Sequence, residues 1–449
     1  MTLIIVGILL IGYLLIATES ITSVNKAAVA IFVCTVGWVL YISYGTDFVM
    51  SQHPDEYLSF LQGQAPSSIA VKEFIASNIF LKYVGEACSV VLYFLATMTI
   101  VEILNNNGCF DFLMQFMKTR NSKWLLWALA IVTFIISAHL DNLSTTVLML
   151  MMMHKIVPNR RQRLIYGATI VVAANCGGAV TVIGSPIGLL IWNNGLASAS
   201  YFFLVMIVPC LLAWSVPIWW MGRSLPGRVE TETIVMPYRG DDTRLNMWQR
   251  LMMLVVGIGG LWFIPTFHNI TKLSPFLGAL CVLSVLWVVN EIFNRKLMNM
   301  DALMGRRMPL SLLYTNHQMV LFIFGVMLAL GVVKETGAVD LAWEALRQAG
   351  VTTWQMGIAT GIVSALLNDF TTATSFLTLN PDQGLNSPYT FMVAYSAAVG
   401  GNVLAVGSVA GAALMKTERM HVGWYFKNVG LACAVGGMMG FIVLLLTVG

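Results

Sequence analysis

Long apolar runs that carry few charges restrict the fold of this chain more than any other feature. Ten runs approach the roughly 20 residues that an α-helix needs to cross a bilayer. They cover residues 2–17, 27–44, 83–104, 164–195, 201–221, 251–267, 275–293, 318–333, 388–415 and 423–448. Hydrophobic residues fill 58% of the 449 positions and charged residues only 10%, whereas about 25% are charged in an ordinary soluble domain. The runs predict an all-α, multi-pass integral membrane protein with about ten transmembrane helices.

Two further apolar stretches, 124–157 and 353–380, are interrupted in the middle by polar residues. Each stretch is too short for two full crossings with a connecting loop. Non-helical backbone is tolerated at membrane depth only where protein or a water-filled cavity surrounds it. We therefore expect two re-entrant hairpins, each of which reaches mid-depth, carries a polar tip and leaves on the side from which it entered.

Basic residues cluster in short loops, as the positive-inside rule expects of a membrane protein, and the net charge is only +4. This pattern indicates the lipid bilayer as a partner and argues against nucleic acid. The five loops contain Lys118, Arg120 and Lys123; Arg160, Arg161 and Arg163; Arg223 and Arg228; Arg295, Lys296, Arg306 and Arg307; and Lys416 and Arg419. If all five are cytoplasmic, loop 45–76 and both termini lie outside, and the two hairpins enter from opposite sides.

The sequence contains an internal repeat. Residues 137–146 (SAHLDNLSTT) align with residues 364–373 (SALLNDFTTA). Two flanking blocks repeat in the same order and at nearly the same offset: NGCFD with TGAVD, and GGAVTVIGSPIG with GGNVLAVGSVAG. Such doubling predicts two halves of inverted topology, as in many secondary transporters. The expected parts are a first repeat at 1–221, with a hairpin at 124–157 and an unwound helix at 164–195; a cytoplasmic linker at 222–250; and a second repeat at 251–449, with a hairpin at 353–380 and an unwound helix at 388–415.

Aspartates stand where the sequence otherwise has the composition of a membrane interior. A charged side chain at the centre of a membrane helix costs about 2.5–3.5 kcal/mol even on lenient scales, so Asp141 and Asp369 need a physical reason. A helix cap can explain one such dipeptide, and close helix packing can explain one glycine block. Their duplication favours a cation site, in which unwound carbonyls and carboxylates bind the ion and a carboxylate also carries a proton.

Two nearby titratable residues are candidates for a proton-linked role. His139 lies beside the first polar tip, and Glu102 lies within an apolar run. The structural alternatives are a hydrogen bond within the helix bundle for His139 and an anchor at the membrane interface for Glu102.

Four segments together resemble one family: FLATMTIVEILNNNGCFDFL, ISAHLDNLSTTVLM, ANCGGAVTVIGSPIGLLIW and VGGNVLAVGSVAGAALMK. They are similar to NhaD-type sodium/proton antiporters of the ion-transporter superfamily, which also contains divalent anion/sodium symporters. The resemblance implies a homodimer of scaffold and transport domains in the inner (plasma) membrane, with elevator-type alternating access. It implies no cofactor besides the transported sodium or lithium and protons.

Carried over position by position, the resemblance implies two half-sites for the cation. The first comprises Asp141, Asn142, Ser144, Thr145, Gly177, Gly178 and Ser185, and the second comprises Asn368, Asp369, Thr371, Thr372, Gly400, Gly401, Gly407 and Ser408. The second tip departs from the family, in which both tips usually read Asp-Asn. A shift of one residue turns a side chain about 100° around a helix, so the orientation of Asp369 toward the ion stays open.

Two other classes of function are alternatives for such a sequence. A sodium-coupled symporter of di- or tricarboxylates shares the fold, but two carboxylates at the site repel such anions, and those symporters carry Ser-Asn-Thr tips. An intramembrane enzyme needs an activated nucleophile or a set of metal ligands, and the sequence has neither an H-E-x-x-H nor a G-x-S-x-G motif. The sequence favours a cation antiporter and indicates no enzyme.

Overall fold

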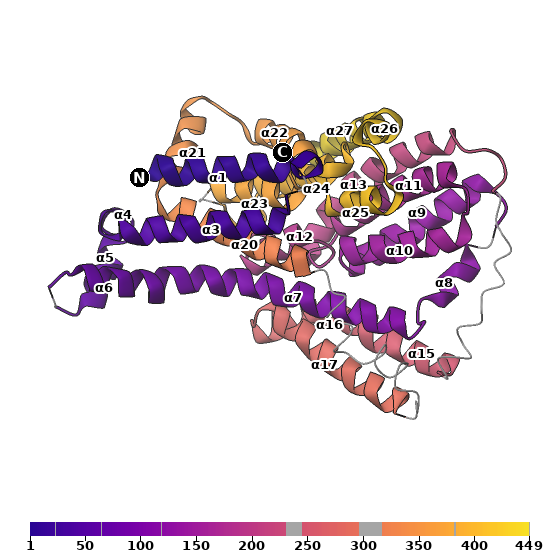
Figure 1. Ribbon diagram of the computed structural model, residues 1–449, viewed down its shortest axis with the longest axis horizontal. Helices are drawn as coiled ribbons and strands as arrows, with labels where there is room; N and C mark the ends of the chain where they lie inside the picture. The colour runs from indigo at the N-terminus through magenta and orange to yellow at the C-terminus, as the bar shows by residue number, and fades with distance from the viewer. Residues whose placement is uncertain are drawn as a thin grey trace.

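The fold is all-helical, as expected, across the residues that the structure describes. This computed structural model describes residues 1–22, 24–63, 65–117, 119–229, 245–295, 317–380 and 383–448 (Figure 1). Residues 230–244 of the expected linker and the basic residues Lys118, Lys296, Arg306 and Arg307 lie outside these ranges.

Eight helical segments in the described ranges are long and apolar enough to cross a membrane, which confirms a multi-pass membrane protein. They are Lys26–Ser43, Ser68–Asn106, Ser122–His139, Ala199–Gly222, Met247–Thr271, Pro275–Asn294, His317–Glu335 and Val422–Val448. The expected span at 2–17 forms a shorter apolar helix, Thr2–Ala17. The expected spans at 164–195 and 388–415 are each divided into two helices.

The helices of the first half follow one another with short connections. They are α1 (Thr2–Ala17), α2 (Glu19–Thr22), α3 (Lys26–Ser43), α4 (Gly45–Gln52), α5 (Pro54–Leu61), α6 (Ser68–Phe74), the π-helical turn η1 (Ile75–Phe80), α7 (Leu81–Asn106), α8 (Asp111–Phe116), α9 (Ser122–His139), α10 (Asn142–Ile156), α11 (Arg160–Gly178), α12 (Pro186–Asn193) and α13 (Ala199–Gly222).

The expected loop at 45–76 is helical, because its sequence supplies starts and stops for short helices. Pro54 occupies the first turn of α5, where a missing amide hydrogen costs nothing. Gln62 ends that helix in the left-handed conformation, with φ of 46°. The Ser67 side chain then caps α6 by accepting a hydrogen bond from the Ala70 amide. α6 runs through η1 into α7, so one helical segment extends over 39 residues.

The second half contains a similar series of helices. They are α15 (Met247–Leu254), η2 (Val255–Gly259), α16 (Gly260–Thr271), α17 (Pro275–Asn294), α20 (His317–Glu335), α21 (Ala338–Gln348), α22 (Thr353–Leu366), α23 (Asp369–Leu379), α24 (Pro388–Gly400), the 3-10 turn η3 (Ala405–Gly407), α25 (Val409–Glu418), α26 (Val422–Tyr425), η4 (Phe426–Gly430) and α27 (Leu431–Val448).

The stretches expected as hairpins each form two helices joined by a short turn. α9 and α10 meet at Leu140, and α22 and α23 meet at Leu367. α10, α22 and α23 have 15, 14 and 11 residues. α9 has 18 residues and is apolar enough to cross a membrane, so it is longer than the half-depth arm that the sequence suggested.

Helices from the two halves pack against each other around the centre of the molecule. α10 contacts α25, and the corresponding helices with the halves exchanged, α23 and α12, are also in contact. Figure 1 shows α9, α10 and α11 extending to one side of α24 and α25, and α22 and α23 lying on the other side. α3 packs on α20, α7 on α17, and α13 on α27.

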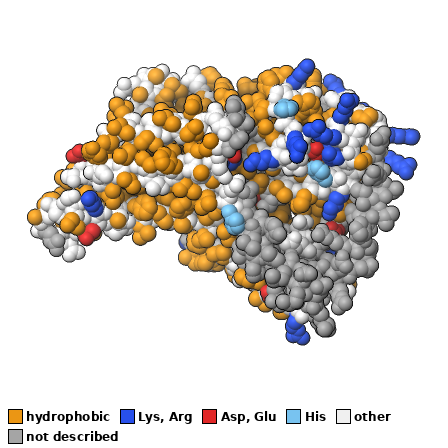
Figure 2. Space-filling model, in the orientation of Figure 1, with side chains coloured by type: hydrophobic (Ala, Val, Ile, Leu, Met, Phe, Trp, Pro, Cys, Tyr) orange, Lys and Arg blue, Asp and Glu red, His pale blue; other side chains and the backbone are white. Residues whose placement is uncertain are grey.

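Basic side chains gather at one end of the molecule. The Arg163 guanidinium lies 2.9 Å from the Glu418 carboxylate, which joins two of the basic loops. The Val229 amide donates a hydrogen bond of 2.9 Å to the Arg120 carbonyl, which joins two more. Figure 2 shows Lys and Arg at the end formed by α9–α11, and a broad apolar surface over α1, α3 and α7. This distribution suits a protein with one basic face beside a membrane.

Candidate functional site

The first polar tip is shaped by Asp141, which caps α10. Its backbone is extended, with φ of −67° and ψ of 151°, and its side chain accepts a hydrogen bond from the Ser144 amide at 2.7 Å. This carboxylate oxygen, Oδ1, therefore satisfies an amide that the helix leaves free. The other oxygen, Oδ2, is buried and has no hydrogen-bond partner within the described ranges. One half of the carboxylate is structural, and the other half is available to a cation or a proton.

In the second tip the capping residue is not the aspartate but the asparagine that precedes it. Asn368, which aligns with Asp141, caps α23 by accepting from the Phe370 amide at 3.1 Å. Asp369 is the first residue of α23, and it aligns with Asn142, the first residue of α10. The reversed dipeptide thus exchanges which residue type caps the helix and which one starts it. Asp369 is 5% exposed and Asn142 is also 5% exposed.

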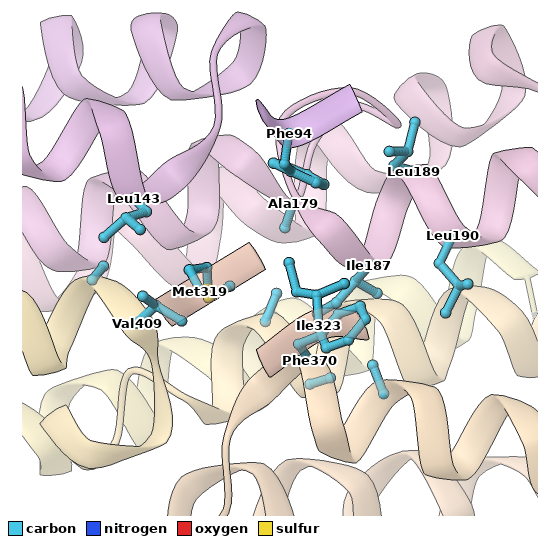
Figure 3. Packing of buried hydrophobic residues seen from close by; sticks show 14 of the residues in the cluster. Phe94, Leu143, Ala179, Ile187, Leu189, Leu190, Met319, Ile323, Phe370 and Val409 are labelled. Carbon is cyan, nitrogen blue, oxygen red and sulfur yellow. The ribbon is translucent and has the colours of Figure 1, made fainter. Parts of the chain in front are cut away.

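A small cavity lies between the two tips. Its volume is about 10 Å³, close to the space that one water molecule needs. The lining residues come from both halves of the chain: Asn142, Asn175, Ser185, Pro186, Ile187, Met319, Asp369, Phe370, Ala398 and Val409. Figure 3 shows the apolar part of this wall, with Val409 beside Met319 and Ile187 beside Phe370. Despite the reversed Asn-Asp order, Asp369 lines the cavity together with Asn142.

Serine caps begin the helices that follow the two glycine blocks. Ser185 accepts a hydrogen bond from the Gly188 amide at 3.2 Å, and Ser408 accepts one from the Gly411 amide at 3.0 Å. The same serines end the segments without α-helix that follow Gly178 and Gly400, and the second of these segments contains η3. Ser185 lines the cavity, whereas Ser408 is fully buried and is not one of the lining residues.

The glycines permit backbone contacts that a side chain would prevent. A Cβ atom on Gly178 would lie 2.6 Å from the Gly184 carbonyl oxygen, and one on Gly401 would lie 2.8 Å from the Gly407 carbonyl oxygen. Gly177 packs in the same way against the Phe134 carbonyl, and Gly400 against the Gly361 carbonyl. Such close approach lets the interrupted helices cross directly behind the tips.

Serines anchor both crossings with equivalent hydrogen bonds. Ser137 on α9 donates to the Ala174 carbonyl on α11 at 2.6 Å. Ser364 on α22 donates to the Ala397 carbonyl on α24 at 2.5 Å. Each serine opens the repeated block of its tip, and each alanine stands three residues before the paired glycines of its own block. Both partners of the first hydrogen bond therefore have their sequence equivalents in the second.

Two asparagines complete a chain of buried amides from the cavity into the protein. The Asn142 amide donates to the Asn175 side-chain oxygen at 3.2 Å, and the Asn175 amide donates to the Asn402 oxygen at 2.8 Å. Neither Asn175 nor Asn402 was among the residues proposed from the sequence. Both belong to the glycine blocks, as ANCGG and GGNV. An asparagine close to a pair of glycines in each half was therefore the sequence feature that could have identified them.

Several hydroxyl groups near the tips have no hydrogen-bond partner in the described part of the chain. They belong to Thr145 of the first tip and to Thr371 and Thr372 of the second. All three threonines are at most 1% exposed. A buried hydroxyl without a partner costs about 1–3 kcal/mol, which an ion or a water molecule can offset. Ser144 is half-buried, and its backbone amide is used by the Asp141 cap.

Two residues considered for a proton-linked role lie away from the cavity. His139 shares a hydrogen bond of 2.7 Å between its Nδ1 and the Ile135 carbonyl, and its ring stacks on Trp262 of α16 at 4.5 Å between centroids. Glu102 on α7 is half-buried and interacts with Asn106, one turn further along the same helix. Neither residue lines the cavity.

Interrupted helices around a buried, carboxylate-bearing cavity in a multi-pass membrane protein define a membrane transporter. The chain belongs to the citrate transporter family, which matches residues 13–381. Membership of a transporter family confirms the expectation that the protein is not an enzyme.

Curated relatives with similar sequences are sodium/proton antiporters. "Sodium/proton antiporter 2" of Arabidopsis thaliana is 26% identical over 442 residues, which cover 96% of this chain and 97% of that protein. "Sodium/proton antiporter 1" of the same plant is 29% identical over 352 residues, or 77% of this chain and 59% of that protein. "Na(+)/H(+) antiporter NhaD" of Vibrio parahaemolyticus is 25% identical over 357 residues, or 74% of this chain and 84% of that protein. The resemblance to NhaD-type antiporters is confirmed.

Proposed function

We propose that this protein is a secondary active antiporter that exchanges sodium or lithium for protons across the membrane. The observation that carries the proposal is the cavity of about 10 Å³ that Asp369 and Asn142 line together. A carboxylate and an amide oxygen are hard ligands of the kind that alkali cations prefer, and the volume suits one dehydrated cation. The curated sodium/proton antiporters that resemble most of this chain give independent support.

The exchange follows from competition for one carboxylate. When sodium occupies the cavity, the ionised Asp369 binds it together with neutral oxygens from Asn142 and Ser185. When a proton binds Asp369 instead, the carboxyl group loses its charge and its affinity for the cation. Each form neutralises a charge that is costly to bury, so the loaded site crosses the membrane with either sodium or a proton, and opposite movements of the two become coupled.

The remaining candidate residues shape the site around this carboxylate. Asp141 supplies a second carboxylate oxygen without a protein partner, and Thr145, Thr371 and Thr372 supply hydroxyl groups. Asn368 and Ser408 cap helices, and the glycines bring unwound carbonyls close to the tips. We assign Asp141 and Asp369 as the proton-linked pair.

The two halves of the chain are further proposed to be repeats of inverted topology. The support comes from equivalent contacts: Gly177 and Gly400 meet the backbone of α9 and α22 at matching positions of the repeat, and the anchors Ser137 and Ser364 also match. In this arrangement α9–α10 and α22–α23 are re-entrant hairpins that enter from opposite sides, and α11–α12 and α24–α25 are the unwound helices. The basic end of the molecule is then cytoplasmic.

The transport cycle is proposed to be of the elevator type in a homodimer of the inner (plasma) membrane. The support is the family resemblance, together with the separation between short interrupted helices and long helices such as α7 and α17 that pack together. In this scheme the short helices carry the cation, and the long helices form the fixed scaffold between two protomers.

A sodium-coupled symporter of a di- or tricarboxylate is the second candidate, because the matching family is described as a citrate transporter. Two observations on the described residues disfavour it. The cavity of about 10 Å³ is far too small for a citrate ion, and no lysine or arginine side chain lines it. A tricarboxylate needs such cationic partners to offset its desolvation.

Flux into proteoliposomes separates the two candidates. Purified protein is reconstituted with a pH-sensitive dye inside, a proton gradient is imposed, and sodium, lithium, potassium or citrate with sodium is added in turn. The proposal expects sodium or lithium alone to collapse the gradient. Accumulation of labelled citrate only in the presence of sodium, with no response to sodium alone, contradicts the antiporter and favours the symporter. Empty liposomes control for leakage.

A further inference from the structure

Lys26 is a basic residue close to the proposed cation site that the exchange described above does not use. It is the first residue of α3, and its side chain is only 15% exposed. A lysine is rarely buried without a partner, because its charge is expensive to remove from water. Its position therefore calls for a functional or structural explanation.

Contacts of Lys26 place its ammonium group against α20, a helix that contributes Met319 to the cavity wall. The Nζ atom lies 5.0 Å from the centre of the Phe322 ring on α20. Phe322 is three residues, or about one helical turn, from Met319, which lines the cavity with Asp369. The ammonium and the Asp369 carboxylate are near enough to interact electrostatically, yet they form no direct ion pair within 4.0 Å in the described structure.

Other charges around Lys26 are few. The Glu19 carboxylate on α2 lies 4.0 Å from Nζ, and its side chain is 25% exposed. Lys416 on α25 is the other cation that interacts with Lys26. The Phe322 ring adds a cation–π contact to the ammonium group. Lys26 is therefore balanced by one partly exposed carboxylate, Glu19, and by Asp369.

The hydrogen bond between α1 and α23 holds the α1–α3 region against the second tip. The Tyr13 hydroxyl lies 2.7 Å from the Ser375 hydroxyl, which is six residues along α23 from Asp369. The two aspartates differ in the titratable group that acts on them. Lys26 acts on Asp369, whereas the neutral Tyr93 on α7 acts on Asp141. A fixed cation is thus present on the Asp369 side of the site.

We propose that the Lys26 ammonium is a resident counter-charge of Asp369 that lowers the affinity of the site for sodium. This inference rests on the proposed antiport. In the sodium-free site the ammonium stabilises the buried carboxylate; when sodium binds, the two cations repel each other and both compete for the same negative charge. Lys26 is not a ligand of sodium. Its charge weakens sodium binding, so that sodium leaves the site readily.

Two variants of opposite sign test this inference by the sodium dependence of proton flux at alkaline pH, where Asp369 is ionised. Lys26→Gln is expected to lower the KM for sodium by about tenfold, a scale set by unit charges at an effective dielectric near 20, with little change in the maximal rate. Glu19→Gln leaves the ammonium without its screening carboxylate and is expected to raise the KM. Lys26→Arg keeps the charge and is expected to retain the wild-type KM.

The matched control is Lys72→Gln, because Lys72 is an exposed lysine on α6 that does not line the cavity. An active Lys26→Gln variant with the wild-type KM overturns the inference, as does a loss of activity that Lys26→Arg does not restore, which indicates a structural role. If Lys26→Gln does not fold, a Glu19→Gln variant with an unchanged or lowered KM is sufficient to overturn it. A wild-type protein without sodium-dependent flux contradicts the proposed antiport instead, so the two failures are distinguishable.

Discussion

Asp141 and Asp369 have the same side chain but different surroundings. Asp141 uses one oxygen to cap α10, whereas Asp369 begins α23 and lines the cavity. Asn368 takes the capping position in the second half, and Asn142 takes the cavity position in the first. The site therefore has one carboxylate at each kind of position, and the order of residues within the second tip decides which wall of the cavity is charged.

Exchanging the two residues of the second tip tests whether transport depends on where its carboxylate lies or only on the presence of that carboxylate. The double variant Asn368→Asp/Asp369→Asn keeps the number of carboxylates and keeps a good capping residue, since Asp and Asn cap helices equally well. It moves the charge from the cavity to the cap. Sodium-driven proton flux is expected to fall by about tenfold or more, equivalent to about 1.4 kcal/mol of cation binding, with the melting temperature nearly unchanged. Full activity in the double variant contradicts the assignment of Asp369 as the cavity ligand.

The single variant Asp141→Asn separates the capping role of Asp141 from its charge. Asparagine retains the cap, so the fold is expected to be intact, but the free carboxylate oxygen and the titratable group are lost. Flux measured in proteoliposomes should be abolished. Asp141→Ala also removes the cap, and it is expected to cost about 1 kcal/mol of stability in addition, seen as a lower melting temperature. An Asp141→Asn protein that exchanges at the wild-type rate shows that Asp369 alone carries the cation and the proton.

Residue types that are unusual for a membrane interior could be found from the sequence, and residues that are ordinary there could not. Asp141, Asp369 and the doubled glycines stand out because each is costly or disruptive within a membrane helix. Asn175 and Asn402 were missed because an amide side chain is less conspicuous, and because their role depends on a contact between helices far apart in the chain. His139 stands beside the tip in sequence, but its ring packs on Trp262.

At the scale of helices, the glycine blocks determine how close the interrupted helices approach the tips. Gly178→Ala is expected to abolish transport, because the added methyl group would lie 2.6 Å from the Gly184 carbonyl and 3.3 Å from the Asn142 side chain. Displacement of Asn142 opens the cavity wall. The matched control is Gly7→Ala in α1, where no atom lies within 4 Å of the added group and alanine favours the helix. Sodium-dependent flux from both variants, at equal levels of folded protein, checks this; equal activity contradicts the close-contact argument.

Helix boundaries could be predicted where the sequence contains strong helix-breaking and capping residues. The breaks after Gly178 and Gly400 lie within the expected unwound helices, since each is followed by a serine cap that restarts a helix. Short helices in 45–76 were not expected, because an isolated turn of helix has little intrinsic stability and depends on tertiary packing. Residues such as Tyr57 and Phe74 supply that packing, with ring centroids 5.4 Å apart.

At the scale of the whole molecule, the class of protein followed from composition, but the assembly of the halves did not. Spans of about 20 apolar residues predict membrane helices whatever their neighbours are. The contact between α10 and α25 and that between α23 and α12 require the two halves to fold around each other. Only this interlocking brings Asn142 of the first half and Asp369 of the second to one cavity.

Binding of one cation at the junction of the halves is expected to stabilise the entire protein. A ligand at about 100 times its dissociation constant adds about 2.7 kcal/mol to the folded state. Sodium and lithium should therefore raise the melting temperature of the detergent-solubilised protein, followed by its tryptophan fluorescence. Choline chloride at equal ionic strength controls for salt effects.

The same measurement on Asp369→Asn tests whether this stabilisation arises at the cavity. The variant removes the carboxylate that neutralises the cation, so its melting temperature is expected to be insensitive to sodium. Without sodium, the variant also leaves the Lys26 ammonium without the Asp369 carboxylate, so its melting temperature is expected to lie below that of the sodium-free wild type. Retained stabilisation by sodium in Asp369→Asn places the cation elsewhere. Stabilisation of the wild type by citrate but not by sodium favours the anion symporter, and the small cavity then belongs to a state of the cycle without substrate.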